Sequence, residues 1–241
     1  MYIRKKILFL LPLLFSLLVS SSEIEEIIVK GEYREKSLGE EDSSIAVIQS
    51  EQIKSQAIKH FQQLSHLVPN LNYAASDSRA RYFQIRGIGE RSGYQGTPNS
   101  SVGFLIDDID YSGQGGIATL FDVDQVEVFR GPQGSRSGAN ALAGLIYIKT
   151  KDPTEKFEGT SELTLGDYGT QNIGIAFGGP MQNKKLKYRL VLRTDYADGF
   201  RKNVYLNKSN TSKKDELTLR YKLNWELNET TNLDFLVSKV D

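Results

Sequence analysis

Cysteine is absent from this sequence of 241 residues, and histidine occurs only twice. The first absence excludes disulfide bridges, thiolate metal sites, catalytic thiols and the lipid-bearing cysteine of an exported lipoprotein. Charge of either sign is not in excess, because 30 Lys and Arg residues balance 30 Asp and Glu residues. A nucleic-acid-binding protein is normally strongly basic, so this balance argues against that class.

Long apolar runs are missing too. The longest, Ile7–Val19, has about thirteen residues and is interrupted by Pro12, whereas a helix that spans a bilayer needs roughly 18–20. A basic cluster at residues 4–6 precedes this run, and serines at 20–22 follow it. This order is typical of a secretory signal peptide, so we predict export and removal of residues 1–22. Any later membrane integration must use strands.

Enzyme signatures are missing as well. Gly87, Gly89 and Gly93 do not complete a dinucleotide fingerprint, and the glycine-rich stretch 131–138 lacks the Lys-Ser/Thr ending of a phosphate loop. Arg136 stands where a nucleophile elbow needs serine. The sequence therefore predicts no enzymatic activity and no cofactor.

Metal-binding patterns are weak. His60 and His66 are off a shared helix face, so we interpret them as ordinary helix residues. Asp107, Asp108 and Asp110 lack the spaced downstream carboxylate of a cation loop, and we expect them to close a strand into a turn. No metal site is predicted.

After the signal peptide, the sequence predicts a charged extended stretch followed by a folded domain. Residues 23–42 are mostly charged, with one short apolar stretch at residues 27–29, and we expect them to be extended and mobile. Residues 44–49 predict a short strand, and Ser50 is expected to cap a helix that ends before Pro69. Strand-like runs then alternate with glycine-rich connections, so residues 43–152 predict one small α+β domain.

Residues 153–241 alternate between apolar and charged positions. We predict about five antiparallel strands in meander order, with one apolar face and one charged face. The outward positions are Leu217, Tyr221, Leu223 and Trp225, and the positions facing the preceding domain are Arg220 and Lys222. A soluble sheet alternates in the same way, but the long runs, the interfacial Tyr and Trp residues and the predicted export favour a transmembrane barrel.

The stretch Ile85–Pro153 resembles the plug domain of TonB-dependent receptors. The resemblance is carried by Ile85-Arg86-Gly87, by Val102–Asp107, by Phe121–Gly134 with its core Glu-Val-Phe-Arg-Gly-Pro-Gln-Gly, and by Gly138–Lys151. It implies that residues 43–152 form a plug inside a barrel of about 22 strands. The expected fold is an α+β plug domain followed by antiparallel transmembrane β-barrel strands, with the barrel incomplete in this N-terminal fragment.

The resemblance also implies roles for particular residues. Residues Glu25, Glu26, Ile27, Ile28 and Val29 resemble the TonB box, which pairs by strand addition with TonB of the inner-membrane energy-transducing complex. Candidates for plug-to-barrel contacts are Arg86, Glu127 and Arg130, because buried charges need partners. Candidates for substrate contact, on the apical loops of the plug, are Tyr94, Tyr111 and Gln114.

The function that this resemblance implies is active uptake of a scarce nutrient complex across the cell outer membrane. The ligand is expected to be a metal chelate, most often an iron-siderophore in this family, although cobalamin, haem or a glycan stays open. The remaining partner is outer-membrane lipid. The alternatives are a passive or adhesive barrel, which needs no plug, a soluble module of residues 40–150, which does not explain the two-faced strands, and a non-transporting fragment of a receptor.

Overall fold

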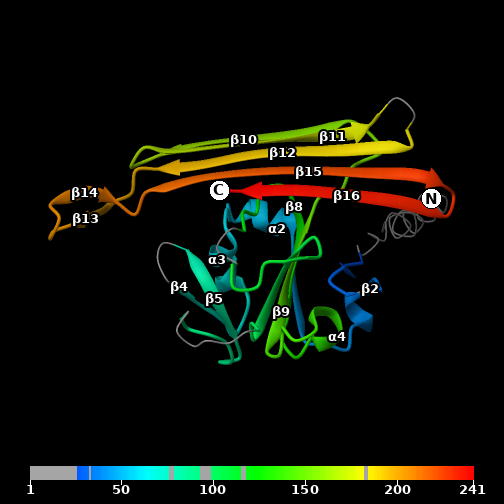
Figure 1. Cartoon of the computed structure of the whole chain (residues 1–241), viewed down its shortest axis with the longest axis horizontal. Coiled ribbons are helices and arrows are strands. Elements are labelled where there is room, and N and C mark those ends of the chain that lie inside the picture. Colours follow the sequence, from blue (N-terminus) through cyan, green and yellow to red (C-terminus); the bar gives the residue numbers. More distant parts are fainter. Residues whose placement is uncertain (1–25, 33, 76–78, 93–98, 115–117, 182–183) are drawn as a thin grey trace, which may run out of the picture.

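A computed structural model of the chain shows a mixed α+β domain beneath a long antiparallel sheet (Figure 1). The structure describes residues 26–32, 34–75, 79–92, 99–114, 118–181 and 184–241. The predicted signal peptide, Glu25 and Tyr94 lie outside these ranges. In the part of the chain that is described, no helix is long and apolar enough to cross a bilayer.

The domain is built on a five-stranded sheet in the order β3-β8-β9-β6-β7. Its strands are β3 (Ile45–Gln49), β8 (Val123–Phe129), β9 (Gly144–Thr150), β6 (Val102–Ile106) and β7 (Ile109–Asp110). Only the β6–β9 pair is parallel. The central strands β8 and β9 are covered on both faces, and β9 is accordingly a nearly continuous apolar run, whereas β8 also carries Asp124, Gln125 and Glu127.

Alternation along β8 and β9 divides the core between the two faces. Val126, Val128, Ile146 and Ile148 belong to the larger apolar cluster, which includes the helices. That cluster is centred on three rings, Phe61, Phe83 and Phe104, whose centroids lie 5.2–5.4 Å apart. Phe129, Leu145 and Tyr147 face the opposite way and form a second cluster with Val29 from the N-terminal segment.

The predicted single helix after residue 49 is two helices. The first is α2 (Ser50–Ser55) and the second is α3 (Phe61–Leu64), continued by the 3₁₀ helix η3 (Ser65–Leu67). Ala57 adopts a φ of 52°, which ends α2, and His60 then forms a β-bridge with Thr119. This long-range pairing overrides the helical spacing. The predicted cap is also wrong, since Ser50 lies inside α2 and its hydroxyl donates to Glu51.

Smaller elements complete the domain. Residues Leu71–Ala75 (β4) and Ala80–Ile85 (β5) form a hairpin, and Gly134–Ser137 (α4) makes one helical turn. Near the N-terminus lie β1 (Ile28–Val29), β2 (Lys36–Ser37) and the 3₁₀ helix η2 (Leu38–Glu40). The turn predicted at the aspartates is present, because Asp107 and Asp108 have positive φ values between β6 and β7.

The second sheet, called the strand wall below, has five antiparallel strands in the order β10-β11-β12-β15-β16. Its strands are β10 (Glu158–Gly166), β11 (Thr170–Pro180), β12 (Leu186–Ala197), β15 (Lys214–Asn228) and β16 (Thr231–Val240). A separate hairpin of β13 (Arg201–Asn203) and β14 (Lys208–Thr211) projects between β12 and β15. The predicted number, direction and meander order are confirmed.

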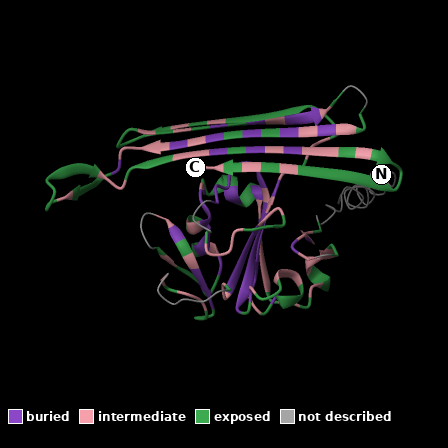
Figure 2. Ribbon diagram, viewed as in Figure 1, coloured by how far each residue is buried: buried purple, intermediate pink, exposed green. Residues whose placement is uncertain are grey.

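The two faces of the strand wall differ as the alternation predicts. Arg220 is 5% exposed and faces the domain, whereas Trp225 is 42% exposed on the outer side. Lys222 also faces the domain, and Leu217, Tyr221 and Leu223 occupy the alternate positions of β15, as predicted. Figure 2 shows the resulting bands of buried and exposed residues along β12 and β15.

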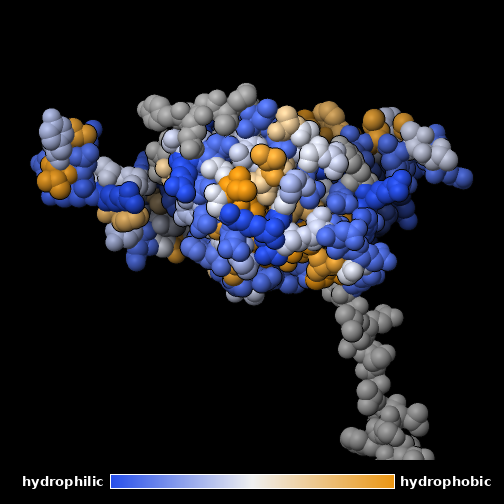
Figure 3. Space-filling view, turned by 90° about the horizontal axis from the view of Figure 1, so that it is seen from below, coloured by the Kyte–Doolittle hydropathy of each residue, from blue (hydrophilic) through white to orange (hydrophobic). Residues whose placement is uncertain are grey.

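Surface hydropathy sets the projecting hairpin apart from the domain. Between β13 and β14, Val204 and Tyr205 are 82% and 95% exposed, and Leu206 is also exposed. Seen from below, the face of the domain turned away from the strand wall is mostly hydrophilic, with scattered apolar patches (Figure 3). The apolar surface is therefore concentrated on the outer side of the strand wall and at this hairpin.

Candidate functional site

The predicted partner-binding segment is docked on the domain. Ile28 and Val29 pair with Ser37 and Lys36, and Val29 is 0% exposed within the cluster around Phe129. The segment is extended, as predicted, and residues 28–31 make contacts with β2 and with the domain. Two features hold the segment: an apolar pocket that Val29 fills, and side chains of β8 that form hydrogen bonds with main-chain atoms of the segment.

Those partners are two polar side chains on β8. The Glu127 carboxylate accepts hydrogen bonds from Lys30 N at 2.7 Å and from Gly31 N at 2.8 Å, and Gln125 Nε2 donates to Ile28 O at 2.8 Å. Lys30 Nζ adds an ion pair with Asp124 at 2.6 Å. The domain thus binds main-chain atoms of residues 28, 30 and 31 in addition to the side chains of Val29 and Lys30.

Glu127 is 0% exposed, and burial raises its pKa even though the main-chain donors and Gln125 favour the carboxylate. Gly31 approaches it closely, since a Cβ at that position would lie 2.7 Å from Glu127 Oε2 and from Phe129 Cε2. Glycine is therefore required for the segment to lie flat on β8. The tight fit explains how a charged group is tolerated inside the domain.

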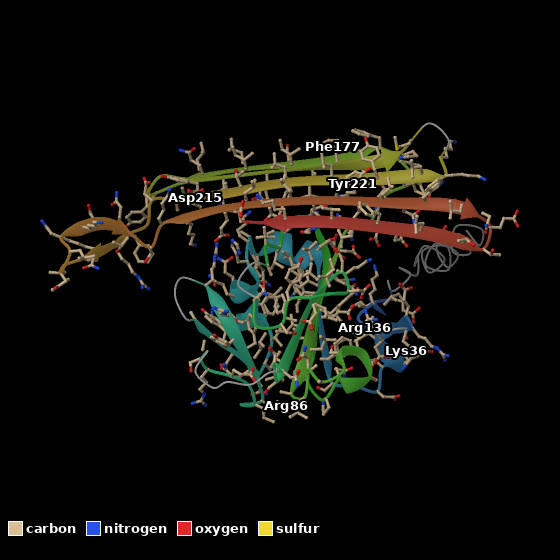
Figure 4. All side chains as sticks on the ribbon, in the orientation of Figure 1. Lys36, Arg86, Arg136, Phe177, Asp215 and Tyr221 are labelled. Carbon is tan, nitrogen blue, oxygen red and sulfur yellow. The ribbon has the colours of Figure 1, made fainter. Side chains whose placement is uncertain are left out.

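The three residues predicted for plug-to-barrel contacts are not brought together with the strand wall in the part of the chain described. Glu127 lies inside the domain and holds the N-terminal segment instead. Arg86 is exposed in the turn after β5, on the side of the domain away from the strand wall (Figure 4). Arg130 is half-buried, and its main-chain N donates to Ser44 O at 2.7 Å. For Arg86 and Arg130 the proposed role stays a prediction.

The contacts between the domain and the strand wall come from other residues. The most buried is the pair Asp122–Arg189, with Nε to Oδ2 at 2.7 Å and Nη2 to Oδ1 at 2.5 Å and with side chains only 1% and 4% exposed. Lys222 Nζ lies 3.0 Å from both Asp107 and Asp152. Alternation had placed Lys222 on the inner face, but nothing in the sequence indicated which carboxylates it would meet.

Further charged contacts lie along this interface between the domain and the strand wall, called the seam below, towards the β13–β14 hairpin. Lys59 Nζ lies 2.6 Å from Glu162 on β10, and Arg79 pairs with Glu216 on β15. Between these contacts and Asp122 lies a cavity of about 460 Å³, lined by residues of α2, of the β8 entry and of the strand wall. The seam is therefore polar and incompletely filled.

One apolar contact between the domain and the strand wall lies among these charged contacts. Phe121 packs against Ala176 and Val191 of the strand wall, and the Arg193 guanidinium lies 5.3 Å from its ring centroid. Gly174 makes room for the ring, because a Cβ there would approach Phe121 to 2.8 Å. Small residues on the inner face of β11 thus admit an aromatic side chain from the domain.

His60 is not the ordinary helix residue predicted. It is buried ahead of α3, where burial and then the charge of Arg79 lower its pKa to about 3. Its ligand-capable atoms lie within 4.8 Å of those of Asp195 and Glu216. The Arg79 guanidinium already lies among these groups, 3.1 Å from His60 Nε2 and paired with Glu216, so the cluster is charge-compensated without a metal ion. His66 is exposed in η3.

The predicted substrate-contact residues are placed differently from one another. Tyr111 is half-buried against the larger core cluster, with its main-chain N bonded to Phe104 O at 2.8 Å. Gln114 is exposed, and its main-chain N donates to Tyr111 O. Of the two, only the side chain of Gln114 is open to solvent, and the role of both stays a prediction.

Comparison with known proteins matches both layers. Residues 37–145 match the family described as TonB-dependent Receptor Plug Domain. The pesticin receptor of Yersinia pestis is 26% identical over 157 residues, which are 65% of this chain and 23% of that protein. The ferripyoverdine receptor of Pseudomonas aeruginosa is 24% identical over 143 residues, 59% of this chain and 17% of that protein. The chain thus spans about a quarter or less of these relatives.

Solved structures extend the likeness to the strands. The ferric yersiniabactin uptake receptor FyuA from Yersinia pestis has a TM-score of 0.73 at 22% identity over 83% of this chain and 31% of that one. The ferripyoverdine receptor of the outer membrane of Pseudomonas aeruginosa has a TM-score of 0.72 at 19% identity, over 89% of this chain and 27% of that one. At these identities the likeness concerns the fold. Together the matches show that residues 37–145 belong to the TonB-dependent receptor plug domain family, and that the antiparallel strands after them share the fold of these receptors.

Proposed function

We propose that this chain serves active, TonB-dependent uptake of a scarce nutrient through the outer membrane, with an iron-siderophore as the ligand. The observation that carries the proposal is the charged seam, where plug carboxylates meet cations on the inner face of the strand wall. A passive pore or an adhesive barrel has no need for a folded domain bound in this way. Outer-membrane lipid contacts the opposite, apolar face.

The coupling partner is TonB, and its site is the segment Glu25–Val29. Strand addition suits a short β-branched peptide, because main-chain hydrogen bonds supply the affinity. Ile28 and Val29 are engaged with β2 and with the pocket around Phe129, so this segment must leave the plug before it pairs with a partner. Since the same region rests on Glu127, a pull on it acts directly on β8.

The choice of ligand rests on the relatives. Their names include a ferripyoverdine receptor and a ferrioxamine B receptor, but also a vitamin B12 transporter. Iron chelates are thus the class that most of these names share. No covalent step on the ligand is proposed, and no resident metal or cofactor is required.

The test is uptake of radioactive iron by iron-starved cells that express the receptor as their only siderophore receptor. The probes are ferrioxamine B, ferripyoverdine and ferric yersiniabactin, each assayed with and without a protonophore, beside binding at low temperature. We expect one chelate to bind in both conditions and to enter only when the inner membrane is energised. If the protonophore does not reduce uptake of the chelate, the protein is a passive barrel instead.

A further inference from the structure

Three cations form a cluster on the inner face of the strand wall. Arg189 on β12 lies directly opposite Lys222 on β15, and Arg220 is two residues before Lys222 on the same strand. Residues that are opposite in an antiparallel pair share one face, and like charges in that position repel each other. All three side chains are buried. Something anionic must therefore compensate them.

In this structure the plug and its connection to the strands supply the compensation. Every ion pair that the described residues give this cluster goes to Asp122, Asp107 or Asp152. The neighbouring inner-face cations differ, because Arg193 pairs with Glu162 and Asp195 of the strand wall itself. When the plug leaves this part of the strand wall, Arg189 loses Asp122 and Lys222 loses Asp107, whereas Arg193 keeps Glu162 and Asp195.

The cluster also has unused donors while the plug is in place. Within the described part of the chain, Arg220 makes no hydrogen bond or ion pair through its side chain, and its Nη1 atom is buried. Nη1 of Arg189 is likewise buried and has no hydrogen-bond partner among the described residues. Arg220 thus adds a third positive charge that the plug carboxylates Asp107 and Asp122 attract without a hydrogen bond or ion pair to its side chain. A buried guanidinium N–H without an acceptor is costly, so the free Nη1 donors of Arg220 and Arg189 are suited to bind another ligand.

We propose that Arg189, Arg220 and Lys222 form an anion-binding site on the strand wall, exposed when the plug is displaced, that receives an anionic oxygen group of the transported ligand. This inference rests on the proposed function, because it needs energy-driven displacement of the plug. Guanidinium groups hold carboxylate, phenolate or phosphate oxygens through paired N–H donors, and the ammonium of Lys222 adds a third charge. The ligand is accordingly a chelate with anionic groups at its surface.

The absence of cysteine makes the site testable without knowing the ligand. Ser238 lies opposite Arg220 in the β15–β16 register, so Ser238→Cys places the only thiol of these 241 residues beside the cluster, and any cysteine elsewhere in the receptor is replaced by serine. The probes are two methanethiosulfonates of similar size, one with a sulfonate and one with a trimethylammonium group. Their modification rates are compared in energised cells, in Ser238→Cys alone and combined with Arg220→Gln or Arg220→Lys.

We expect the sulfonate reagent to react about tenfold faster relative to the cationic reagent in Ser238→Cys than in the variant with Arg220→Gln, because a cleft lined by cations concentrates anions. Arg220→Lys should keep the preference. An equal ratio in all three receptors, or no modification in energised cells, overturns the site. Adding Ile28→Pro separates the two proposals. If modification stays fast with it, coupling-driven displacement fails, whereas loss of the charge preference alone concerns only the anion site.

Discussion

The plug has two buried interfaces in this structure, and they are stabilised by different chemistry. Against the N-terminal segment it presents an apolar pocket for Val29 and main-chain partners on Gln125 and Glu127. Against the strand wall it presents carboxylates that meet cations, around a cavity of about 460 Å³. One interface is close-packed, while the other is charged and incompletely filled.

This difference suggests how each interface yields. Main-chain hydrogen bonds and a single apolar side chain are released one after another when an extended segment is peeled away. Ion pairs between two folded surfaces weaken together when the surfaces separate, and water entering the cavity can solvate the freed charges. The segment is therefore suited to transmit a pull, and the seam is suited to part under it.

The largest expected effect separates the pull from the ligand. Proline at position 28 removes a main-chain donor and restricts the preceding residue, so Ile28→Pro should abolish uptake by the full receptor. Ile28→Val keeps the backbone and should transport normally. Both variants should bind ligand at low temperature like the parent, measured on cells matched for surface level. Transport by the proline variant would argue against strand addition, and lost binding would mean that the segment supports the plug's ligand site.

The next effect concerns the seam. Asp122→Asn leaves Arg189 buried without its carboxylate and should lower the free energy of plug unfolding by about 3–5 kcal/mol. Amide hydrogen exchange of β8 in the purified receptor measures this. Asp215→Asn breaks the exposed pair with Lys213 and serves as the control, with no measurable change expected. Unaltered exchange in Asp122→Asn would show that the seam does not stabilise the plug.

The strand wall was predictable because period-two alternation over long strands allows one register, and a slip by one residue would bury Trp225 and expose Arg220. The plug was predictable from its motif around Glu127–Gly134. The break at Ala57 was not, because its cause is the bridge from His60 to Thr119, far along the chain.

Partner choice inside the site was equally hidden from the sequence. Asp122 and Arg189 are 67 positions apart, and Lys30 and Glu127 are 97 apart. One signal did exist, since Glu127 stands between Val126 and Val128 in a strand-like run and must find donors inside the fold if it is buried. Its motif suggested contacts with the barrel, whereas the donors came from the N-terminal segment.

A smaller effect tests how far side chains hold the segment. Val29→Ala removes two buried methyl groups, which at roughly 0.8 kcal/mol each should weaken docking by about 1.5 kcal/mol. The undocked population should then rise roughly tenfold, seen as faster tryptic cleavage after Lys30 in the folded receptor. Ile27→Ala changes a less buried neighbour and should alter cleavage less. If both variants were cleaved as slowly as the unsubstituted receptor, the main-chain contacts alone would account for docking.

The smallest effect is the response of docking to pH, which we expect to arise from Glu127. Burial raises the pKa of Glu127 above its ordinary value of 4.5, so the docked segment favours the protonated carboxyl. By linkage, this contribution to docking is fully present below the ordinary pKa and is lost as pH rises through the raised value. Docking should therefore tighten as pH falls from neutrality into the acid range. The change is followed by the fluorescence of a dye on Ile27→Cys, the only thiol within these 241 residues, between neutral pH and pH values near 4.5, with any cysteine elsewhere in the receptor replaced by serine. In Glu127→Gln the titration should be flat. A wild-type signal that moves in the opposite direction would mean that the hydrogen bonds from Lys30 and Gly31 outweigh burial and that the ionised carboxylate is the form that holds the segment.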